Sequence, residues 1–207
     1  MLKTIGKNLL SGVAAGICIA VGGTVFLACD NKYAGSLAFA VALLCICYKG
    51  YSLFTGKIGF IPEKHGRAEV SVLLWGLLGN LIGTLLCGAA IRYALPLIGA
   101  GAEGLAAAKF ASQTAGQTFL RGCFCGVLMY LAVSIFRDHK TPVGILFCIP
   151  VFILSGFEHS IADMFYFFAA ASYTLKTAAF LFLVLAGNAV GAMVLPVLNG
   201  GFKRAKG

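Results

Sequence analysis

Long apolar stretches separated by short polar connections run through almost the whole chain of 207 residues. A helix needs about 20 mainly apolar residues to cross a bilayer. Six stretches approach or exceed this length: 9–29, 35–60, 70–94, 118–136, 143–173 and 177–198. The pattern predicts an all-α membrane protein with six transmembrane helices, held in the lipid bilayer as a single transmembrane domain over residues 1–207. We expect no separate catalytic domain.

The composition agrees with this prediction. Hydrophobic residues make up 60% of the chain and charged residues only 11%, against about a quarter in soluble domains. The net charge of +9 comes from basic residues scattered through the connections. Because nucleic-acid-binding proteins cluster such residues, we expect no nucleic-acid partner. The eight cysteines lie in or beside apolar stretches without a Cys-x-x-Cys pair, and we predict neither a metal site nor a cofactor.

The basic residues also predict the orientation in the membrane, because short cytoplasmic connections carry an excess of Lys and Arg. With the N-terminus in the cytoplasm, nine of these residues lie inside and four outside. The inner set is Lys3, Lys7, Lys64, Arg67, Arg137, Lys140, Lys203, Arg204 and Lys206, and the outer set is Lys32, Arg92, Lys109 and Lys176. We therefore expect a multi-pass protein of the cell (plasma) membrane with both termini cytoplasmic.

The interruptions of the apolar pattern recur in the same order in two halves of the chain, about 1–98 and 110–207. Leu53-Phe54-Thr55-Gly56 interrupts the second stretch, and Ser155-Gly156-Phe157-Glu158-His159 interrupts the fifth. Gly79-Asn80 and Gly187-Asn188 then lie in the third and sixth stretches. Because each half has three stretches, an odd number, the halves enter the membrane in opposite directions, as in an inverted repeat.

The two interruptions predict that helices 2 and 5 are broken inside the membrane. Unwound backbone survives at that depth only in a protein interior or beside a wet cavity, so we expect the two breaks to share one cavity. For the first break alone, a simpler interpretation stays open: Gly50, Gly56 and Gly59 only permit close helix packing.

The most polar motif within an apolar stretch is Gly156-Phe157-Glu158-His159-Ser160-Ile161-Ala162-Asp163-Met164-Phe165. A charged group at the centre of a spanning helix costs about 2.5–3.5 kcal/mol on insertion scales, so such groups usually mark a transport path. A broken helix also leaves free N–H groups at the start of its second part, and these attract anions. The motif therefore favours an anionic passenger.

His159 is the only histidine within an apolar stretch. We expect its ring to be neutral at rest and to gain a proton when an anion arrives, so that a weak acid can cross in its neutral form. The alternative is a neutral ring bonded to a carbonyl that only holds the loop. Thr55 and Asn188 are predicted to orient His159 or to contact the passenger.

Other residues of the breaks are assigned supporting roles. We expect Asn80 to brace the first break and Glu158 to accept backbone N–H groups of the opposite loop, with Gly56 and Gly156 as structural support. Asp163 is expected to cap the resumed helix. Three large apolar residues near the breaks are predicted to form constrictions, with core packing as the alternative: Leu53, Phe54 and Phe152.

Lys109 lies in the connection after the third stretch, where it could gather anions at the mouth of the path. A solvated loop lysine is the alternative.

Together these motifs resemble the formate/nitrite transporter family. The resemblance is carried by Leu53-Phe54-Thr55-Gly56, Gly79-Asn80-Leu81-Ile82-Gly83, Arg121-Gly122 with Cys125 before Leu131-Ala132-Val133, the motif at 156–165, and Gly187-Asn188. It implies an aquaporin-like six-helix protomer, a homopentamer with one pore per subunit, and passage of formate, nitrite or hydrosulfide. It also implies roles by position: His159 as central pore histidine, Thr55 and Asn188 as its polar neighbours, Phe54 and Phe152 at constrictions, and Lys109 as vestibule cation.

The chain departs from the family pattern at three positions. Family members usually carry Asn where this chain has Gly126, often an acidic residue where Ser52 stands, and a smaller polar residue at Lys57. We predict a pH-sensitive channel or proton-coupled transporter for small monovalent weak-acid anions, not an enzyme. The alternatives are a pore for water or glycerol and, less favoured, an intramembrane hydrolase using Ser52, Ser155 or Ser160 with His159.

Overall fold

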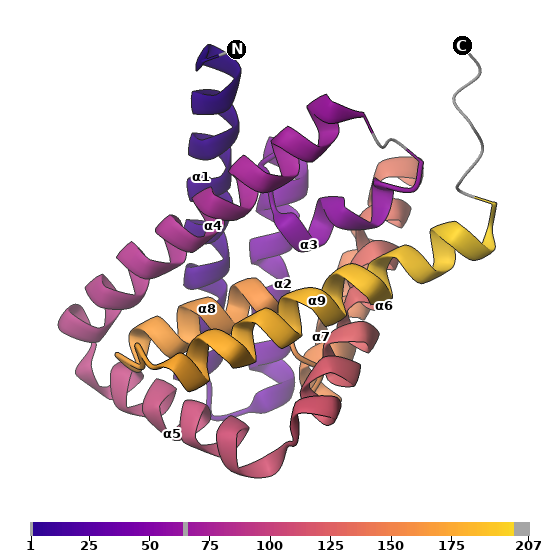
Figure 1. Cartoon of the computed structure of the whole chain (residues 1–207). Helices are drawn as coiled ribbons and strands as arrows, with labels where there is room; N and C mark the ends of the chain where they lie inside the picture. The colour runs from indigo at the N-terminus through magenta and orange to yellow at the C-terminus, as the bar shows by residue number, and fades with distance from the viewer. Residues whose placement is uncertain (1, 64–65, 201–207) are drawn as a thin grey trace.

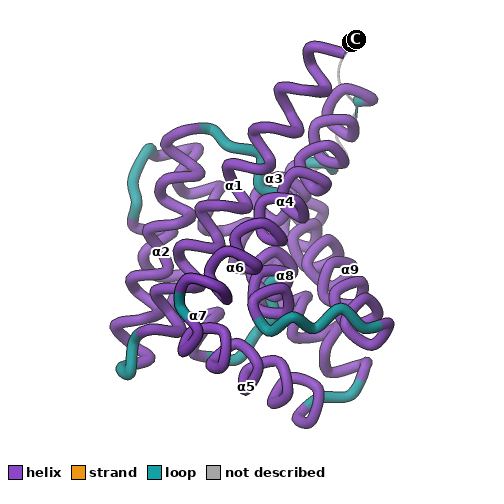
Figure 2. Tube along the Cα trace, turned by 90° about the vertical axis from the view of Figure 1, so that its left-hand side faces the viewer, coloured by secondary structure: helices purple, strands orange, loops and turns teal. Residues whose placement is uncertain are grey.

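The computed structural model describes residues 2–63 and 66–200, and all regular structure within them is helical (Figures 1 and 2). The elements in chain order are α1 (Leu2–Ala28), α2 (Lys32–Lys49), α3 (Phe54–Lys57), the 3-10 turn η1 (Ile58–Phe60), α4 (Arg67–Ala94), α5 (Pro96–Ser112), α6 (Ala115–His139), α7 (Val143–Leu154), α8 (Ser160–Ala169) and α9 (Leu175–Leu198).

Five of these helices, α1, α2, α4, α6 and α9, are long and apolar enough to cross a membrane. α7 and α8 are apolar but shorter. Large apolar side chains such as Leu86, Phe147 and Phe182 are exposed on the outside of the bundle, as expected where lipid replaces water. These features are those of a multi-pass membrane protein.

Two of the six predicted stretches each hold more than one helix. α2 and α3 are separated by 50–53, and α7 and α8 by 155–159. The connection that was expected to carry Lys109 contains a helix, because residues 96–112 form α5. Proline favours the first turn of a helix, where its missing N–H is not needed, and Pro96 begins this one.

The predicted orientation depends in part on basic residues that lie outside the described residues: Lys64, Lys203, Arg204 and Lys206. Figure 1 shows that α1 begins and α9 ends on the side of the bundle away from α5, which runs along the other end. Which of these ends faces the cytoplasm stays a prediction.

Two helix pairs form the frame of the bundle. α1 packs along α4, and α6 packs along α9. A methyl group added at Gly12 would overlap the Gly76 carbonyl, and one at Gly126 would overlap the Asn188 carbonyl. Small residues at helix crossings allow backbones to meet this closely in membranes. The glycines therefore fix the distance between the helices of each pair.

α8 is the central helix of the bundle. Every residue from Ser160 to Ala169 is buried, and the helix contacts α1, α4, α5 and α9. Its polar N-terminal residues consequently lie in the protein interior and not against lipid.

Candidate functional site

The turns that precede α3 and α8 have the same backbone geometry. Gly50 follows α2 with φ +69°, and Gly156 follows α7 with φ +70°. Side chains disfavour this left-handed conformation, and glycine adopts it freely. In both turns the next N–H donates back to a helix carbonyl: Tyr51 to Ile46 at 3.0 Å, and Phe157 to Phe152 at 3.0 Å. Gly50, and not Gly56, is therefore the counterpart of Gly156.

Asn80 holds the backbone of the first interruption. Its side-chain oxygen accepts from the Phe54 N–H at 2.9 Å, and its NH₂ group donates to the carbonyls of Ser52 at 2.8 Å and Gly12 at 2.9 Å. The side chain is fully buried. Asn80 thus satisfies backbone groups on both sides of Leu53 and ties them to α1.

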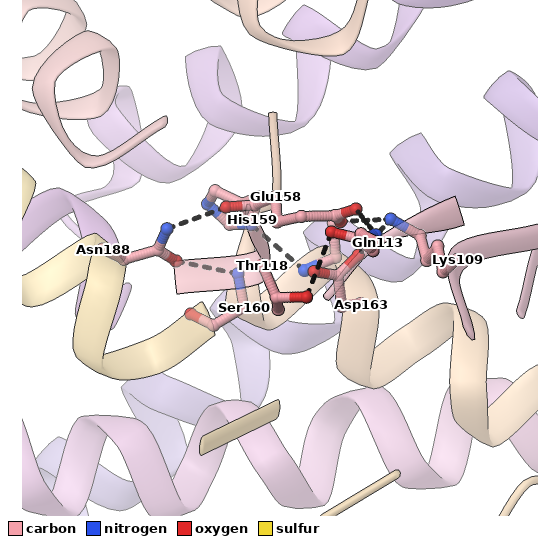
Figure 3. Close-up of polar contacts among 9 residues, drawn as sticks. Lys109, Gln113, Thr118, Glu158, His159, Ser160, Asp163 and Asn188 are labelled. Carbon is pink, nitrogen blue, oxygen red and sulfur yellow. Dashed lines mark hydrogen bonds and ion pairs between the residues drawn. The ribbon is translucent and has the colours of Figure 1, made fainter. Parts of the chain in front are cut away.

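Asn188 makes the same three contacts at the second interruption. It accepts from the Ser160 N–H at 2.8 Å and donates to the carbonyls of Glu158 at 2.8 Å and Gly122 at 2.9 Å. Figure 3 shows this amide beside Glu158 and Ser160, on the other side of the segment from Lys109. Its hydrogen bonds join backbone groups, and His159 lies between the two residues that it holds.

His159 caps α8 with its own side chain, so the expectation that Asp163 caps this helix was wrong. The Nδ1 atom accepts from the Ala162 N–H at 3.1 Å, and Nε2 lies 2.8 Å from Thr55 Oγ1. A nitrogen that accepts carries no proton, so the neutral ring carries its proton on Nε2 and donates it to Thr55. The Thr55 hydroxyl keeps its own hydrogen for another acceptor.

Aromatic rings surround the imidazole. The Phe152 ring stacks on His159 with centroids 5.6 Å apart and an interplanar angle of 25°. Phe39 of α2 lies edge-on to Phe152 at 6.2 Å. Sequence reasoning missed Phe39, because it is one apolar residue among many in its stretch.

A buried ionic cluster lies next to His159 (Figure 3). Lys109 of α5 pairs with Glu158 and also with Asp163, whose Oδ1 atom is 3.0 Å from the Lys109 Nζ. Gln113 Nε2 donates to Glu158 Oε1 at 2.7 Å, and Thr118 donates to Gln113 at 3.2 Å. The expected bonds from loop N–H groups to the Glu158 carboxylate were wrong, since it accepts from the side chains of Lys109 and Gln113.

Two cavities are lined by residues at or near the contact between His159 and Thr55. The His159 cavity has a volume of about 220 Å³ and is lined by Phe39, Lys109, Arg121, Phe152, Glu158, His159 and Asp163, among others. The Lys57 cavity has a volume of about 330 Å³ and is lined by Leu53, Gly56, Lys57, Phe60, Phe136, Arg137 and Lys140, among others.

The positions of Leu53 and Gly56 relate the Lys57 cavity to the contact with His159. Both residues line the Lys57 cavity, and Thr55 lies between them in the chain and contacts His159. Phe54 is buried, but it does not line either cavity. Among residues 2–63 and 66–200, no group of three His, Cys, Asp or Glu side chains is placed to hold a metal ion.

Comparisons with known proteins agree on one family. The family model described as formate/nitrite transporter matches residues 1–199. The uncharacterised transporter YwcJ of Bacillus subtilis (strain 168) is 30% identical over 183 residues, which cover 79% of this chain and 71% of YwcJ. The formate channel FocA of Haemophilus influenzae is 26% identical over 76% of this chain, but the match spans less than two thirds of FocA, at 64%.

A solved structure shares the arrangement of the helices. It is titled a pentameric formate channel with formate bound, and it superimposes with a TM-score of 0.74 at 25% identity, covering 96% of each chain.

Proposed function

Because the chain belongs to the formate/nitrite transporter family, we propose that it is a channel or transporter for small monovalent weak-acid anions, such as formate, nitrite or hydrosulfide. The observation that carries the proposal is the contact between two buried side chains, His159 and Thr55. His159 lines one cavity, and Thr55 lies between two residues, Leu53 and Gly56, that line the other. An anion that passes from one cavity to the other would meet a hydroxyl donor at this point.

His159 and Thr55 perform different steps in this proposal. At rest the neutral His159 donates to Thr55, and the free Thr55 hydrogen points to the passenger. When the ring turns away from the Ala162 N–H, Nδ1 becomes free to take a proton. The imidazolium then pairs with the anion and passes the proton to it, and the neutral acid leaves while His159 returns to its neutral form. Passage as a neutral acid avoids the cost of a bare charge inside the membrane.

Most of the remaining site residues keep the roles that the sequence suggests. Phe152, stacked on His159, and Leu53, beside Thr55, are the proposed apolar constrictions. For Phe54, which is buried and lines neither cavity, we propose core packing, the alternative to a constriction. Lys109 is the proposed cation of the outer mouth. Glu158, Asn80, Gly156 and Gly56 support the breaks, and Asn188 orients the backbone around His159.

We propose that the bundle consists of two inverted three-helix repeats with broken helices 2 and 5, in an aquaporin-like arrangement. The matching contacts of Asn80 and Asn188 support this architecture. The packing of α1 on α4 and of α6 on α9 has the same correspondence. The pentameric title of the similar structure supports a homopentamer with one path in each subunit, and the basic residues favour cytoplasmic termini in the cell membrane.

Uptake into liposomes tests the proposal. Purified protein in liposomes that contain a pH indicator is mixed with formate, nitrite, hydrosulfide, acetate or lactate, and with glycerol in a parallel light-scattering assay. We expect rapid flux of at least one small anion, faster at lower pH, and no accelerated glycerol flux. Glycerol flux without anion flux would instead identify a neutral-solute pore, and no flux of any solute would reject transport.

A further inference from the structure

Lys57 and Ser52 occupy positions that correspond to Asp163 and Glu158 in the other half. The carbonyl of Ser52 accepts from the Asn80 amide at 2.8 Å, and the carbonyl of Glu158 accepts from the Asn188 amide at 2.8 Å. Lys57 follows Ser52 by the same number of residues as Asp163 follows Glu158. Equivalent positions of the fold therefore carry two carboxylates in one half, and a hydroxyl and an ammonium group in the other.

The charges of these two clusters are neutralised to different extents. Lys109 pairs with both Glu158 and Asp163. Lys57 Nζ donates to Ser52 Oγ at 3.0 Å, and none of the ion pairs within residues 2–63 and 66–200 involves Lys57. A hydroxyl partner does not neutralise an ammonium group, and a charge in such a half-buried place is stabilised by a counter-ion.

The surroundings of Lys57 leave room for that counter-ion. Lys57 lines the Lys57 cavity together with Arg137 and Lys140, and among the described lining residues none is acidic. Lys57 also borders a second cavity of about 400 Å³, which includes one acidic residue, the exposed Glu69. Arg137 is already paired with Glu63 at 3.3 Å and Asp138 at 2.9 Å. These two carboxylates offset Arg137, whereas Lys57 and Lys140 are in none of the ion pairs among the described residues. Of these two lysines, Lys57 is the one that lies two residues from Thr55 in the chain.

The His159 cavity has a different balance. Its lining includes Lys109 and Arg121, but also Glu158 and Asp163, so its formal charges cancel. A cavity wall with net positive charge raises the local concentration of anions more than a wall whose charges balance. The two ends of the path consequently differ in their attraction for a negatively charged passenger.

We infer that Lys57 and Ser52 form an anion-binding site in the Lys57 cavity, which holds a small monovalent oxyanion before it reaches Thr55 and His159. The inference rests on the proposed function. Two donors, the ammonium and hydroxyl groups, match two oxygens of a carboxylate or of nitrite, and the volume of about 330 Å³ accommodates such an anion with water. Entry of anions from this side would saturate at lower concentration than entry from the His159 side.

The test combines anion flux with direct observation of a bound ion. In liposomes with oriented protein at low ionic strength, Lys57→Met is expected to raise the half-saturating formate concentration from the Lys57 side on the order of tenfold, with the effect weakened by salt. Lys57→Arg keeps the charge and is expected to stay near wild type. Lys49→Met is the matched control, because Lys49 is exposed and lines neither cavity.

Crystals soaked in bromide provide the second readout. We expect anomalous density within about 3.5 Å of Lys57 Nζ in the wild type and none there in Lys57→Met. The inference is overturned if the wild type lacks this density, or if Lys57→Met conducts formate with unchanged half-saturation. If the wild type conducts no anion, the proposed function fails, and the bromide density alone then decides whether the site exists.

Discussion

The Nε2 atom of His159 lies 2.8 Å from the Oγ1 atom of Thr55, although the two residues are 104 positions apart in the chain. His159 ends the segment between α7 and α8, and Thr55 lies in α3, the short helix that follows the segment between α2 and α3. Because Nδ1 of the same ring accepts from the Ala162 N–H, the hydrogen bond to Thr55 has a defined direction. The contact therefore links the two halves. It also sets the direction of a series of hydrogen bonds, in which the His159 ring donates to Thr55 and the Thr55 hydroxyl donates to a further acceptor.

Replacing Thr55 by Val tests this series of hydrogen bonds, since it removes the hydroxyl group and nearly preserves the side-chain shape. The buried Nε2–H loses its acceptor, at a cost of about 1–3 kcal/mol, and the passenger loses its donor. We expect anion flux in liposomes to fall on the order of tenfold or more. Thr55→Ser, which keeps the hydroxyl, is expected to retain most of the flux. Equal flux in Thr55→Val and wild type would show that transport does not need the Thr55 hydroxyl group.

Replacing His159 by Phe removes the proposed proton acceptor. A proton binds more readily to His159 as the pH falls, so wild-type flux is expected to rise on acidification. In His159→Phe we expect this rise to be reduced to what the passenger's own protonation supplies, as measured by initial rates between pH 5 and 8. His139→Phe changes an exposed histidine at the end of α6 and serves as control. An unchanged pH profile in His159→Phe would give His159 a purely structural role.

Asn188→Leu is expected to destabilise the fold strongly. The variant leaves the Ser160 N–H and the carbonyls of Glu158 and Gly122 without their partner, and each buried unsatisfied group costs about 1–3 kcal/mol. Asn80→Leu should have the same effect at the first interruption. Asn199→Leu, at an exposed position after α9, is the control. Thermal unfolding in detergent measures the difference, and control-like melting temperatures for the two variants would contradict the bracing role.

Lys109→Met leaves the carboxylates of Glu158 and Asp163 buried without their cation. Removing one partner of a buried ion pair costs about 3–5 kcal/mol, so we expect a markedly lower melting temperature. The triple variant Lys109→Met, Glu158→Gln, Asp163→Asn removes all three charges and is expected to recover much of the loss. If Lys109→Met melts like the wild type, the ion pairs do not stabilise the protein.

Gly126→Asn introduces the residue that the family usually carries. A side chain at this position would overlap the Asn188 carbonyl, so α6 and α9 would have to separate. We expect a lower melting temperature, and also slower flux because Asn188 holds the backbone on both sides of His159. Gly101→Asn places the same side chain in open space on α5 and is the matched control. A variant as stable as this control would show that the crossing can relax.

The sequence located His159, Thr55 and the two asparagines because each is a polar residue where an apolar pattern would be expected. The sequence alone does not predict all the contacts that these residues make. Lys109 meets Glu158 and Asp163 only through the packing of α5 against α8, which no local pattern encodes. Phe39 is apolar in an apolar stretch and thus carries no signal. The self-capping of His159 depends on a side-chain rotamer and not on residue type.

The hydrogen bonds of Asn80 and Asn188 to the interrupted segments also constrain how the protein is synthesised. Phe54 leaves the ribosome 26 residues before Asn80, and Ser160 leaves it 28 residues before Asn188. At about 5–20 residues per second, each interrupted segment therefore waits roughly one to six seconds for the side chain that satisfies it. During that time its polar backbone needs water or the insertion machinery as a substitute partner. Co-translational assembly consequently proceeds in two steps. The first interrupted segment gains its partner when α4 is made, and the second gains its partner when α9 is made.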